Sequence, residues 1–292
     1  MRDFSADHRW LSINTATVRR QRGQDWPLLQ ILDACAARGI RAVSPWRDQV
    51  QAAGLAATCQ AVKAHGLELS GYCRGGMFTY DGNAQRQAVR DDNRRALDEA
   101  CELGAPCLVL VVGGLPGALS GHARHKDIDH ARLQVAEGVQ ALLEDARERG
   151  MPLAIEPLHP MYAADRACIN TLEQALDLCD RLDPQHSGAL GVAVDVYHVW
   201  WDPKLPAQIE RAGRARLLAL HVCDWLTPTT DLLNDRGMMG DGVIDIPRLR
   251  GWAEAQGYAG YAEVEIFSSA HWWQRDGAEV LDTCIQRHRR CV

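Results

Sequence analysis

The sequence alternates short apolar runs with longer amphipathic segments, and this alternation repeats along the chain. Several amphipathic segments close with a glycine that an apolar run follows, at Gly39, Gly66, Gly104, Gly150 and Gly257. Glycine readily adopts the left-handed conformation that ends a helix and turns the chain back. The repeat therefore predicts strands that alternate with helices.

The apolar runs are nearly continuous, which is typical of parallel strands that are covered on both faces. Eight strands are predicted, at residues 10–14, 40–44, 68–72, 107–112, 153–156, 190–194, 217–221 and 261–266. Eight helices are predicted, at residues 27–38, 51–65, 86–103, 130–149, 171–182, 205–214, 247–256 and 277–287. Strand followed by helix, eight times over, predicts an α/β protein of the (β/α)8 TIM barrel class, a single domain over residues 1–292.

The alternative fold is a doubly wound sheet. It would need a glycine-rich phosphate-binding loop after an early strand, and neither G-x-G-x-x-G nor a P-loop occurs. Gly75-Gly76 and Gly113-Gly114 are too sparse to serve. A chain of 292 residues that is 47% hydrophobic is long enough for one large core, as in other α/β barrels.

Charge and composition exclude several classes of protein. A formal net charge of −6 and only three lysines argue against a general nucleic-acid binder, because that affinity comes largely from clustered basic residues. No apolar run is long enough to span a membrane, and the first ten residues lack the apolar stretch of a secretory signal. The ten cysteines include no C-x-x-C pair. We expect a reduced, cytoplasmic protein with neither nucleic acid nor membrane as partner.

The active site of a TIM barrel lies at the C-terminal ends of its strands. In chain order, the residues at these predicted ends are Asn14 and Thr15, Trp46 and Arg47, Cys73 and Arg74, Gly113 and Gly114, Glu156, Asp195, His221, and Glu265. The last four strands thus end in an acid, an acid, a histidine and an acid.

A buried carboxylate is costly unless it is paired or binds a metal ion. Salt bridges to Arg47, Arg74 or Arg236 are the alternative for any one of these acids. Four such residues at one level of a barrel favour a metal site. Three oxygen ligands and one imidazole suit Mn²⁺, Mg²⁺ or Co²⁺ better than a closed structural zinc site. Glu263 points to the same side of its strand as Glu265. Glu265 is preferred as a ligand because it lies nearer the strand end.

Four short motifs appear in order along the second half of the chain: A-I-E-P at 154–157, V-D-V-Y-H at 194–198, H-V-C-D at 221–224 and E-V-E-I-F at 263–267. With these motifs the chain resembles the xylose-isomerase-like barrels. That superfamily includes sugar and sugar-phosphate isomerases, ketose 3-epimerases, inosose dehydratases, dehydroshikimate dehydratases and zinc-type apurinic endonucleases. The resemblance covers nearly the whole chain in its organisation.

The resemblance implies that Glu156, Asp195, His221 and Glu265 match the four metal ligands of the family. They would hold one divalent ion, with Mn²⁺ favoured and Mg²⁺, Co²⁺ or Zn²⁺ as alternatives. It also implies that His198 matches the D-x-x-H histidine that contacts substrate in the epimerases. Arg236 is similar in placement to one of their substrate-binding arginines.

Two departures narrow the assignment. The zinc endonucleases use extra histidines on the earlier strands, where this chain has Cys73-Arg74 and Gly113-Gly114. With the acidic net charge, this argues against a nuclease. No lysine matches the catalytic lysine that some dehydratases use. Dimers and tetramers are common among similar proteins, and the oligomeric state, including a homo-oligomer, stays open.

The predicted activity is that of a metal-dependent sugar isomerase or epimerase acting on a small keto-sugar or polyol through an enediolate. Glu156 and Glu265 are the candidates for proton abstraction and return. His198 would hold or protonate a substrate oxygen, and Asp224 would orient a neighbouring imidazole. A dehydratase or lyase of a keto-sugar, keto-inositol or 3-keto-glycoside is the alternative. A non-catalytic sugar-binding barrel is the second.

Other residues near the strand ends are candidates for binding substrate. His159 follows the ligand Glu156 closely, with a structural loop histidine as the alternative. Trp46 and Trp200 offer rings that cover the apolar face of a sugar, although tryptophan also packs in loops and interfaces. Arg47 and Arg74 suit a phosphate or carboxylate, with ion pairing in the barrel mouth as the alternative.

Overall fold

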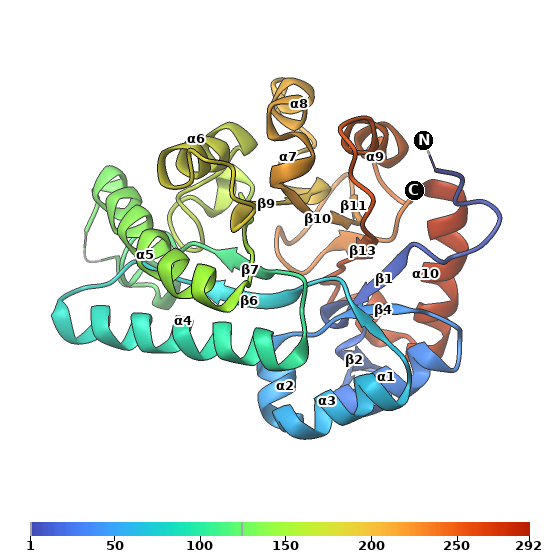
Figure 1. Ribbon diagram of the computed structural model, residues 1–292. Helices are drawn as coiled ribbons and strands as arrows, with labels where there is room; N and C mark the ends of the chain where they lie inside the picture. Colours follow the sequence, from blue (N-terminus) through green and yellow to red (C-terminus); the bar gives the residue numbers. More distant parts are fainter. Residues whose placement is uncertain (1, 124) are drawn as a thin grey trace. The chain divides into compact units, whose positions relative to one another are not determined.

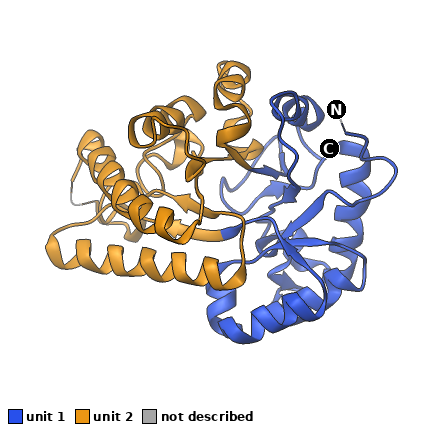
Figure 2. Ribbon diagram, viewed as in Figure 1, with its two compact units in different colours: residues 1–72, 219–292 blue, residues 73–218 orange. Residues whose placement is uncertain are grey.

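The computed structural model describes residues 2–123 and 125–292, in which strands alternate with helices (Figure 1). The chain divides into two compact units (Figure 2). Unit 1 consists of residues 1–72 and 219–292, and unit 2 consists of residues 73–218. The expectation of a single domain stays a prediction.

Unit 1 contains parallel strands in the order β5-β4-β1-β13-β10. Their bounds are β5 Glu68–Leu69, β4 Ala42–Ser44, β1 Leu11–Asn14, β13 Ala262–Val264 and β10 Leu217–Val222, the last entering this unit at residue 219. The register pairs Ile13 with Val264 on one side and with Val43 on the other. Nearly every side chain of β1, β4 and β13 is fully buried, as strands covered on both faces require.

The other elements of unit 1 surround these strands or follow them. The helices are α1 Leu28–Ala36, α2 Arg47–Ala53, α3 Leu55–Ala64, α9 Ile246–Ala255 and α10 Gly277–Cys291, with 3-10 turns η1 Thr15–Val18 and η4 Trp272–Gln274. Two antiparallel pairs of short strands are β2 Arg20–Gln21 with β3 Gln24–Asp25, and β11 Asp224–Trp225 with β12 Arg236–Gly237.

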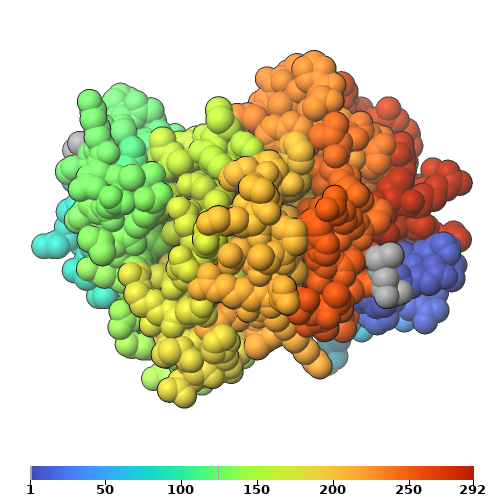
Figure 3. Space-filling view, turned by 90° about the horizontal axis from the view of Figure 1, so that it is seen from above, coloured from blue at the N-terminus to red at the C-terminus, as the bar shows by residue number. Residues whose placement is uncertain are grey.

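Unit 2 contains strands in the order β9-β8-β7-β6. Their bounds are β9 Leu190–Asp195, β8 Leu153–Ile155, β7 Leu108–Val111 and β6 Tyr72–Gly76. The helices are α4 Asn83–Leu103, α5 Ile128–Arg149, α6 Leu172–Leu182, α7 Val196–Val199 and α8 Leu205–Arg216, with 3-10 turns η2 Ala118–Ser120 and η3 Pro160–Tyr162. The α6 and α8 helices pack together and form the yellow and amber surface in Figure 3.

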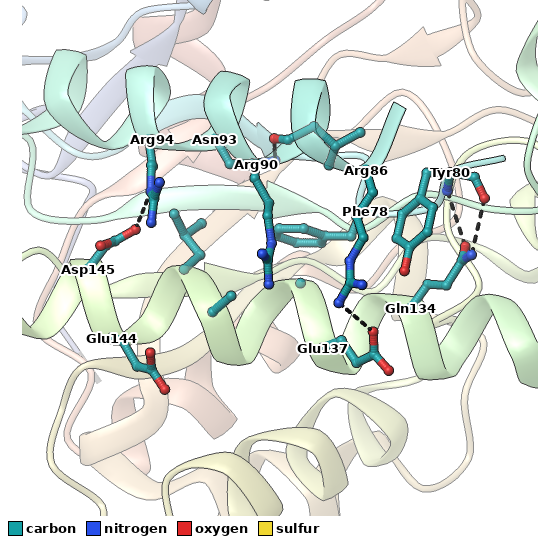
Figure 4. Close-up of a pocket in the computed structure, with 14 residues that line it drawn as sticks. Phe78, Tyr80, Arg86, Arg90, Asn93, Arg94, Gln134, Glu137, Glu144 and Asp145 are labelled. Carbon is teal, nitrogen blue, oxygen red and sulfur yellow. Dashed lines mark hydrogen bonds and ion pairs between the residues drawn. The ribbon is translucent and has the colours of Figure 1, made fainter. Parts of the chain in front are cut away.

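The α4 and α5 helices lie side by side and enclose a cleft of about 250 Å³ (Figure 4). Ion pairs cross the cleft from Arg86 to Glu137 at 3.4 Å and from Arg94 to Asp145 at 2.8 Å. None of the predicted site residues lines it. The cleft is therefore a feature of helix packing and lies apart from the strand-end chemistry.

The glycine stops that the repeat predicts are confirmed. Gly104 and Gly150 cap α4 and α5 in the left-handed conformation, with φ of 71° and 64°. One predicted helix is wrong: residues 51–65 form two helices, because Gly54 has φ 90° and ψ 129° and breaks the chain between α2 and α3. The single-turn helix α7 was not predicted.

The third predicted strand, at residues 68–72, is also wrong in its extent, because β6 continues through Cys73 and Arg74 to Gly76. Gly75 and Gly76 are uncommon in strands, so nothing in the sequence indicates that the strand continues through them. A Cβ on Gly75 would lie 3.0 Å from the Leu110 side chain, and one on Gly76 would lie 2.0 Å from the Val111 carbonyl oxygen. Glycine therefore marks the close approach of β6 to β7 rather than a loop.

The ten cysteines, all among the described residues, form no disulfide. None of the helices in the described part of the chain has both the length and the apolar character needed to cross a membrane.

Candidate metal centre

In unit 2, two carboxylates follow neighbouring parallel strands. Glu156 comes directly after β8, and its N–H donates to the Leu110 carbonyl at 3.1 Å, which continues the ladder to β7. Asp195 is the last residue of β9, which pairs with β8. Both side chains are buried. The apolar runs thus deliver two acids to the same edge of the sheet, where parallel strands end together.

The two carboxylate oxygens of Asp195 make different contacts. Oδ1 accepts from the Tyr197 N–H at 2.9 Å and so caps the short helix α7. Oδ2 lies 3.5 Å from Nε2 of His198. The cap therefore explains why the chain turns into a helix directly after the strand, and it brings the D-x-x-H histidine back beside the aspartate.

Aromatic rings surround His198, which is itself 2% exposed. Tyr162 and Tyr197 contact its imidazole edge-on, with ring centroids 5.8 Å and 5.5 Å away. Trp201 donates from Nε1 to the His198 carbonyl at 2.8 Å. This cluster fixes the orientation of the imidazole by packing.

His159 lies in the loop after β8 and belongs to the same cluster. Its ring contacts Trp201 edge-on at 5.8 Å, and its Nδ1 accepts from the Met161 N–H at 3.3 Å, which caps η3. Burial lowers the pKa of His159 below its usual value. Sequence reasoning did not select Trp201 or Tyr162 as site residues. Only their positions after strand ends could have signalled them.

In unit 1, His221 on β10 and Glu265 directly after β13 form the corresponding pair. The Glu265 N–H donates to the Val222 carbonyl at 3.2 Å, so the two strands stay in register up to this candidate ligand. Nδ1 of His221 lies 3.8 Å from Oε2 of Glu265. Both side chains are buried.

Arg236 lies on β12 and is 3% exposed. Its Nη1 donates to Oε2 of Glu265 at 3.1 Å and to the Glu265 carbonyl at 3.2 Å. Its guanidinium also lies over the Phe267 ring, 5.2 Å from the centroid. The structure thus places Arg236 on a candidate ligand. Contact with substrate stays a prediction for this residue.

Asp224 does not orient an imidazole, and this prediction is wrong. Its carboxylate accepts four backbone N–H groups at 2.9 Å, from Trp225, Gly240, Gly242 and Ile244. The residue instead holds the loop that follows β12. A carboxylate with that many backbone donors has no capacity left to act on a neighbouring side chain.

The remaining candidates lie in both units. Trp46 is the N-cap residue of α2 and is half-buried, and Arg47 is the first residue of that helix and is 9% exposed. Arg74 lies within β6 rather than after it. Trp200 ends α7. Binding of substrate by these residues stays a prediction.

Four buried residues meet the requirements of a metal site. One ligand atom from each of Glu156, Asp195, His221 and Glu265 lies within 4.8 Å of the others. Ligands at about 2.1 Å from a common ion are separated by distances of this order. Carboxylate oxygens with one imidazole are the donors that Mn²⁺, Mg²⁺ and related hard ions accept. The buried acidic and histidine cluster therefore fits a divalent metal site.

Comparison with known proteins identifies the family. Residues 32–284 match the family described as xylose isomerase-like TIM barrel. The chain belongs to this family. The predicted (β/α)8 TIM barrel fold is thereby confirmed, as is the resemblance inferred from the four motifs. Most members of the superfamily are enzymes, among them isomerases, epimerases and dehydratases.

Solved structures extend the comparison. A protein from Sinorhizobium meliloti 1021 is 56% identical, with 97% of this chain and 98% of that one covered and a TM-score of 0.90. The IolI protein, solved with a bound zinc atom, is 16% identical over 95% of both chains, with a TM-score of 0.78. The 3-keto-D-glucoside 4-epimerase YcjR from E. coli is 18% identical over 97% and 99%, with a TM-score of 0.73. No curated protein sequence matches the chain.

Proposed function

We propose that the chain is a divalent-metal-dependent isomerase or epimerase of a small keto-sugar or polyol. The observation that carries this proposal is the buried set of Glu156, Asp195, His221 and Glu265, whose ligand atoms lie within 4.8 Å of one another. The set brings three buried carboxylates together, and a divalent cation would offset the cost of their burial and mutual repulsion.

A bound divalent ion supplies a Lewis acid that polarises a substrate carbonyl. Glu156 and Glu265 are the proposed bases, one removing a proton from the carbon beside the carbonyl and the other returning one. Return to the same carbon from the opposite side gives epimerisation, and return to the neighbouring carbon gives isomerisation. His198 donates a hydrogen bond to a substrate oxygen, because packing by Tyr162 and Tyr197 fixes its ring beside Asp195.

The relatives support the metal and the substrate class. The zinc atom of the IolI structure supports a divalent ion, and the keto-glucoside epimerase supports a carbonyl-bearing sugar. The oxygen-rich ligand set favours Mn²⁺ as the working ion, with Mg²⁺, Co²⁺ and Zn²⁺ as competitors. The aromatic cluster of His159, Trp201 and Tyr162 offers rings that suit the apolar face of a sugar.

Deuterium uptake tests this proposal. The Mn²⁺-loaded protein is incubated in D2O with ketoses, aldoses, 3-keto-glycosides and inososes, and each substrate is followed by proton NMR. Metal-dependent uptake at a carbon beside a carbonyl, lost in Glu156→Gln and Glu265→Gln, is the expected result. Glu144→Gln, which changes an exposed carboxylate on α5, is the control and keeps the activity.

The products separate the alternatives. Retention of every substrate atom supports the isomerase or epimerase, whereas loss of water or of an aglycone indicates a dehydratase or lyase. Product without uptake indicates a hydride-shift isomerase. Metal binding with neither uptake nor product across the panel favours a sugar-binding barrel. A protein that holds no metal when loaded would overturn the proposal.

A further inference from the structure

Glu263 is a buried carboxylate to which the proposed reaction assigns no role. It lies two residues before Glu265 and is 1% exposed. Oε1 accepts from Asn14 Nδ2 at 2.7 Å, and Oε2 accepts from the Ser70 hydroxyl at 2.7 Å. Ser70 in turn lies 2.6 Å from the hydroxyl of Ser12. Polar side chains from β1 and from the segment after β5 thus surround this carboxylate, and their hydrogen bonds compensate for its burial.

His221 lies between this carboxylate and the candidate ligand Glu265. Its Nε2 is 3.5 Å from Oε1 of Glu263, and its Nδ1 is 3.8 Å from Oε2 of Glu265. His221 and Glu263 are also register partners on the paired strands β10 and β13. Each ring nitrogen therefore faces a different glutamate.

The hydrogen bonds of Asn14 decide which of its amide atoms faces Glu263. The other amide atom receives the indole N–H of Trp46 at 2.7 Å and the N–H of Ala16 at 3.1 Å. Both of these groups are donors, so that atom is the carbonyl oxygen, and the NH2 group must face Glu263. Oε1 of Glu263 is therefore an acceptor.

The same logic fixes the proton on the imidazole. Nε2 of His221 forms no hydrogen bond among the described residues, and the carboxylate oxygen that faces it is Oε1 of Glu263 at 3.5 Å. An acceptor on this side favours a proton on Nε2, which makes Nδ1 the nitrogen that carries a lone pair. Nδ1 is the nitrogen on the side of Glu265. A histidine that binds metal through one nitrogen commonly donates the other N–H to a carboxylate, which fixes the tautomer and the ring orientation.

We propose that Glu263 is a positioning residue that holds His221 in the tautomer and orientation needed to bind the metal. The chain of hydrogen bonds from Trp46 through Asn14 to Glu263 keeps that carboxylate in place. This inference rests on the proposed function, because it assumes that His221 binds a divalent ion. It assigns to Glu263 no contact with substrate.

Glu263→Gln tests the proposal with little change of shape. The glutamine NH2 group replaces either Oε1, where it meets the Asn14 NH2 and the His221 N–H, or Oε2, where it donates to the Ser70 hydroxyl and leaves a neutral carbonyl toward His221. Either arrangement removes the negative charge and weakens the acceptor that faces the Nε2-protonated imidazole. We expect Mn²⁺ affinity, measured by isothermal titration calorimetry, to fall about 10- to 100-fold. Ser70→Ala removes one of the two hydrogen bonds to Glu263, and we expect a smaller loss of about two- to fivefold.

Histidine NMR provides a readout that a merely structural role would not change. Long-range proton–nitrogen spectra of the metal-free protein report which ring nitrogen carries the proton. We expect the His221 signal, assigned by its loss in His221→Gln, to show protonation at Nε2 in the parent protein. In Glu263→Gln the fraction of His221 that is protonated at Nδ1 is expected to rise, because the negatively charged acceptor beside Nε2 is lost.

Asp183→Asn is the matched control. Asp183 is fully buried in unit 2 and pairs with Arg147 at 2.8 Å and Arg216 at 3.5 Å, so its loss weakens the fold away from the proposed ligands. We expect a lower melting temperature with unchanged Mn²⁺ affinity. Folded Glu263→Gln with parental affinity and tautomer would overturn the role of Glu263. If it does not fold, parental affinity in Ser70→Ala would do so. A parent protein that binds no Mn²⁺ would overturn the proposed function itself.

Discussion

Unit 1 contains two fully buried imidazoles, and their surroundings differ. His221 at the end of β10 has a carboxylate on each side, Glu263 at 3.5 Å and Glu265 at 3.8 Å. His288 on α10 stacks on the Phe4 ring, with centroids 4.6 Å apart and planes 14° from parallel. The Arg250 guanidinium covers the same phenyl ring at 3.9 Å. The two histidines are equally buried, but carboxylates lie beside His221 whereas an aromatic ring lies against His288.

The partners decide what each imidazole does. Burial is the main cause that lowers the pKa of His288, to about 3, and nearby Arg250 lowers it further. His288 is thus a neutral packing group at ordinary pH. Acceptor oxygens on both sides of His221 instead suit a ring that holds a proton on one nitrogen and a cation on the other. A buried histidine is therefore a candidate ligand only when oxygens face it.

The largest expected effect is a loss of Mn²⁺ affinity when His221, but not His288, is replaced. His221→Gln removes a proposed ligand, and we expect Mn²⁺ affinity to fall more than about 100-fold, beyond the effect of losing an outer partner. His288→Leu should leave the affinity within about twofold, because it changes only packing. Calorimetric titration of both variants measures this. Equal losses in the two would show that general destabilisation, not ligation, sets the affinity.

Acid titration sharpens the comparison through stability. Unfolded His288 takes up a proton near its usual pKa of 6.5, whereas the folded state resists protonation down to about pH 3. The unfolded state binds more protons in this window, so stability falls as pH drops below 6.5. Between pH 6.5 and pH 5 the loss is about 2 kcal/mol.

Urea unfolding at several pH values checks this expectation. His288→Leu removes the titrating group and should flatten the curve over the same window. A slope that survives in this variant would assign the acid sensitivity to other groups.

The sequence was sufficient for the residues that end apolar strands. Glu156, Asp195, His221 and Glu265 end apolar runs that are visible without any structure, and strand ends are where a TIM barrel carries its active site. The sequence failed where a short stretch of residues indicated the wrong local structure. Gly75 and Gly76 indicate a loop by composition, yet they lie in β6 because β7 passes too close for a side chain.

The environment of each site residue could not be predicted in this way. Asn14 and Glu263 are 249 residues apart, and no spacing rule connects them. The placement of Arg236 on Glu265 likewise depends on the short β11–β12 pair, which has no strong sequence signal. Residue type and position predict which groups reach the site, whereas tertiary packing decides which oxygen or nitrogen each group faces.

A smaller effect is expected at Arg236. Arg236→Lys keeps the positive charge beside Glu265 but loses the rigid planar guanidinium, whose Nη1 donates to both the carboxylate and the carbonyl. We expect kcat/KM to fall about tenfold, with Mn²⁺ affinity changed much less. Steady-state kinetics at saturating Mn²⁺, beside calorimetry, separate these quantities. An equal fall in metal affinity would instead make Arg236 a support for ligation, like Glu263.

The smallest effect is expected where distance is similar but burial is absent. Arg86 and Glu137, on α4 and α5, lie 3.4 Å apart, close to the 3.5 Å between His221 and Glu263, yet their side chains are 40% and 60% exposed. Water and salt screen such a pair, and holding two long side chains costs entropy.

We therefore expect a coupling energy below about 0.5 kcal/mol for this pair, measured by urea unfolding of Arg86→Gln, Glu137→Gln and the double variant. It should vanish in high salt. A coupling energy several times larger would mean that the cleft between α4 and α5 excludes water. The distance between two charged groups, rather than their burial, would then decide how strongly they interact in this chain. If this coupling is small and Glu263→Gln strongly lowers Mn²⁺ affinity, burial is the difference between the two pairs. Their separations, 3.4 Å and 3.5 Å, are nearly equal.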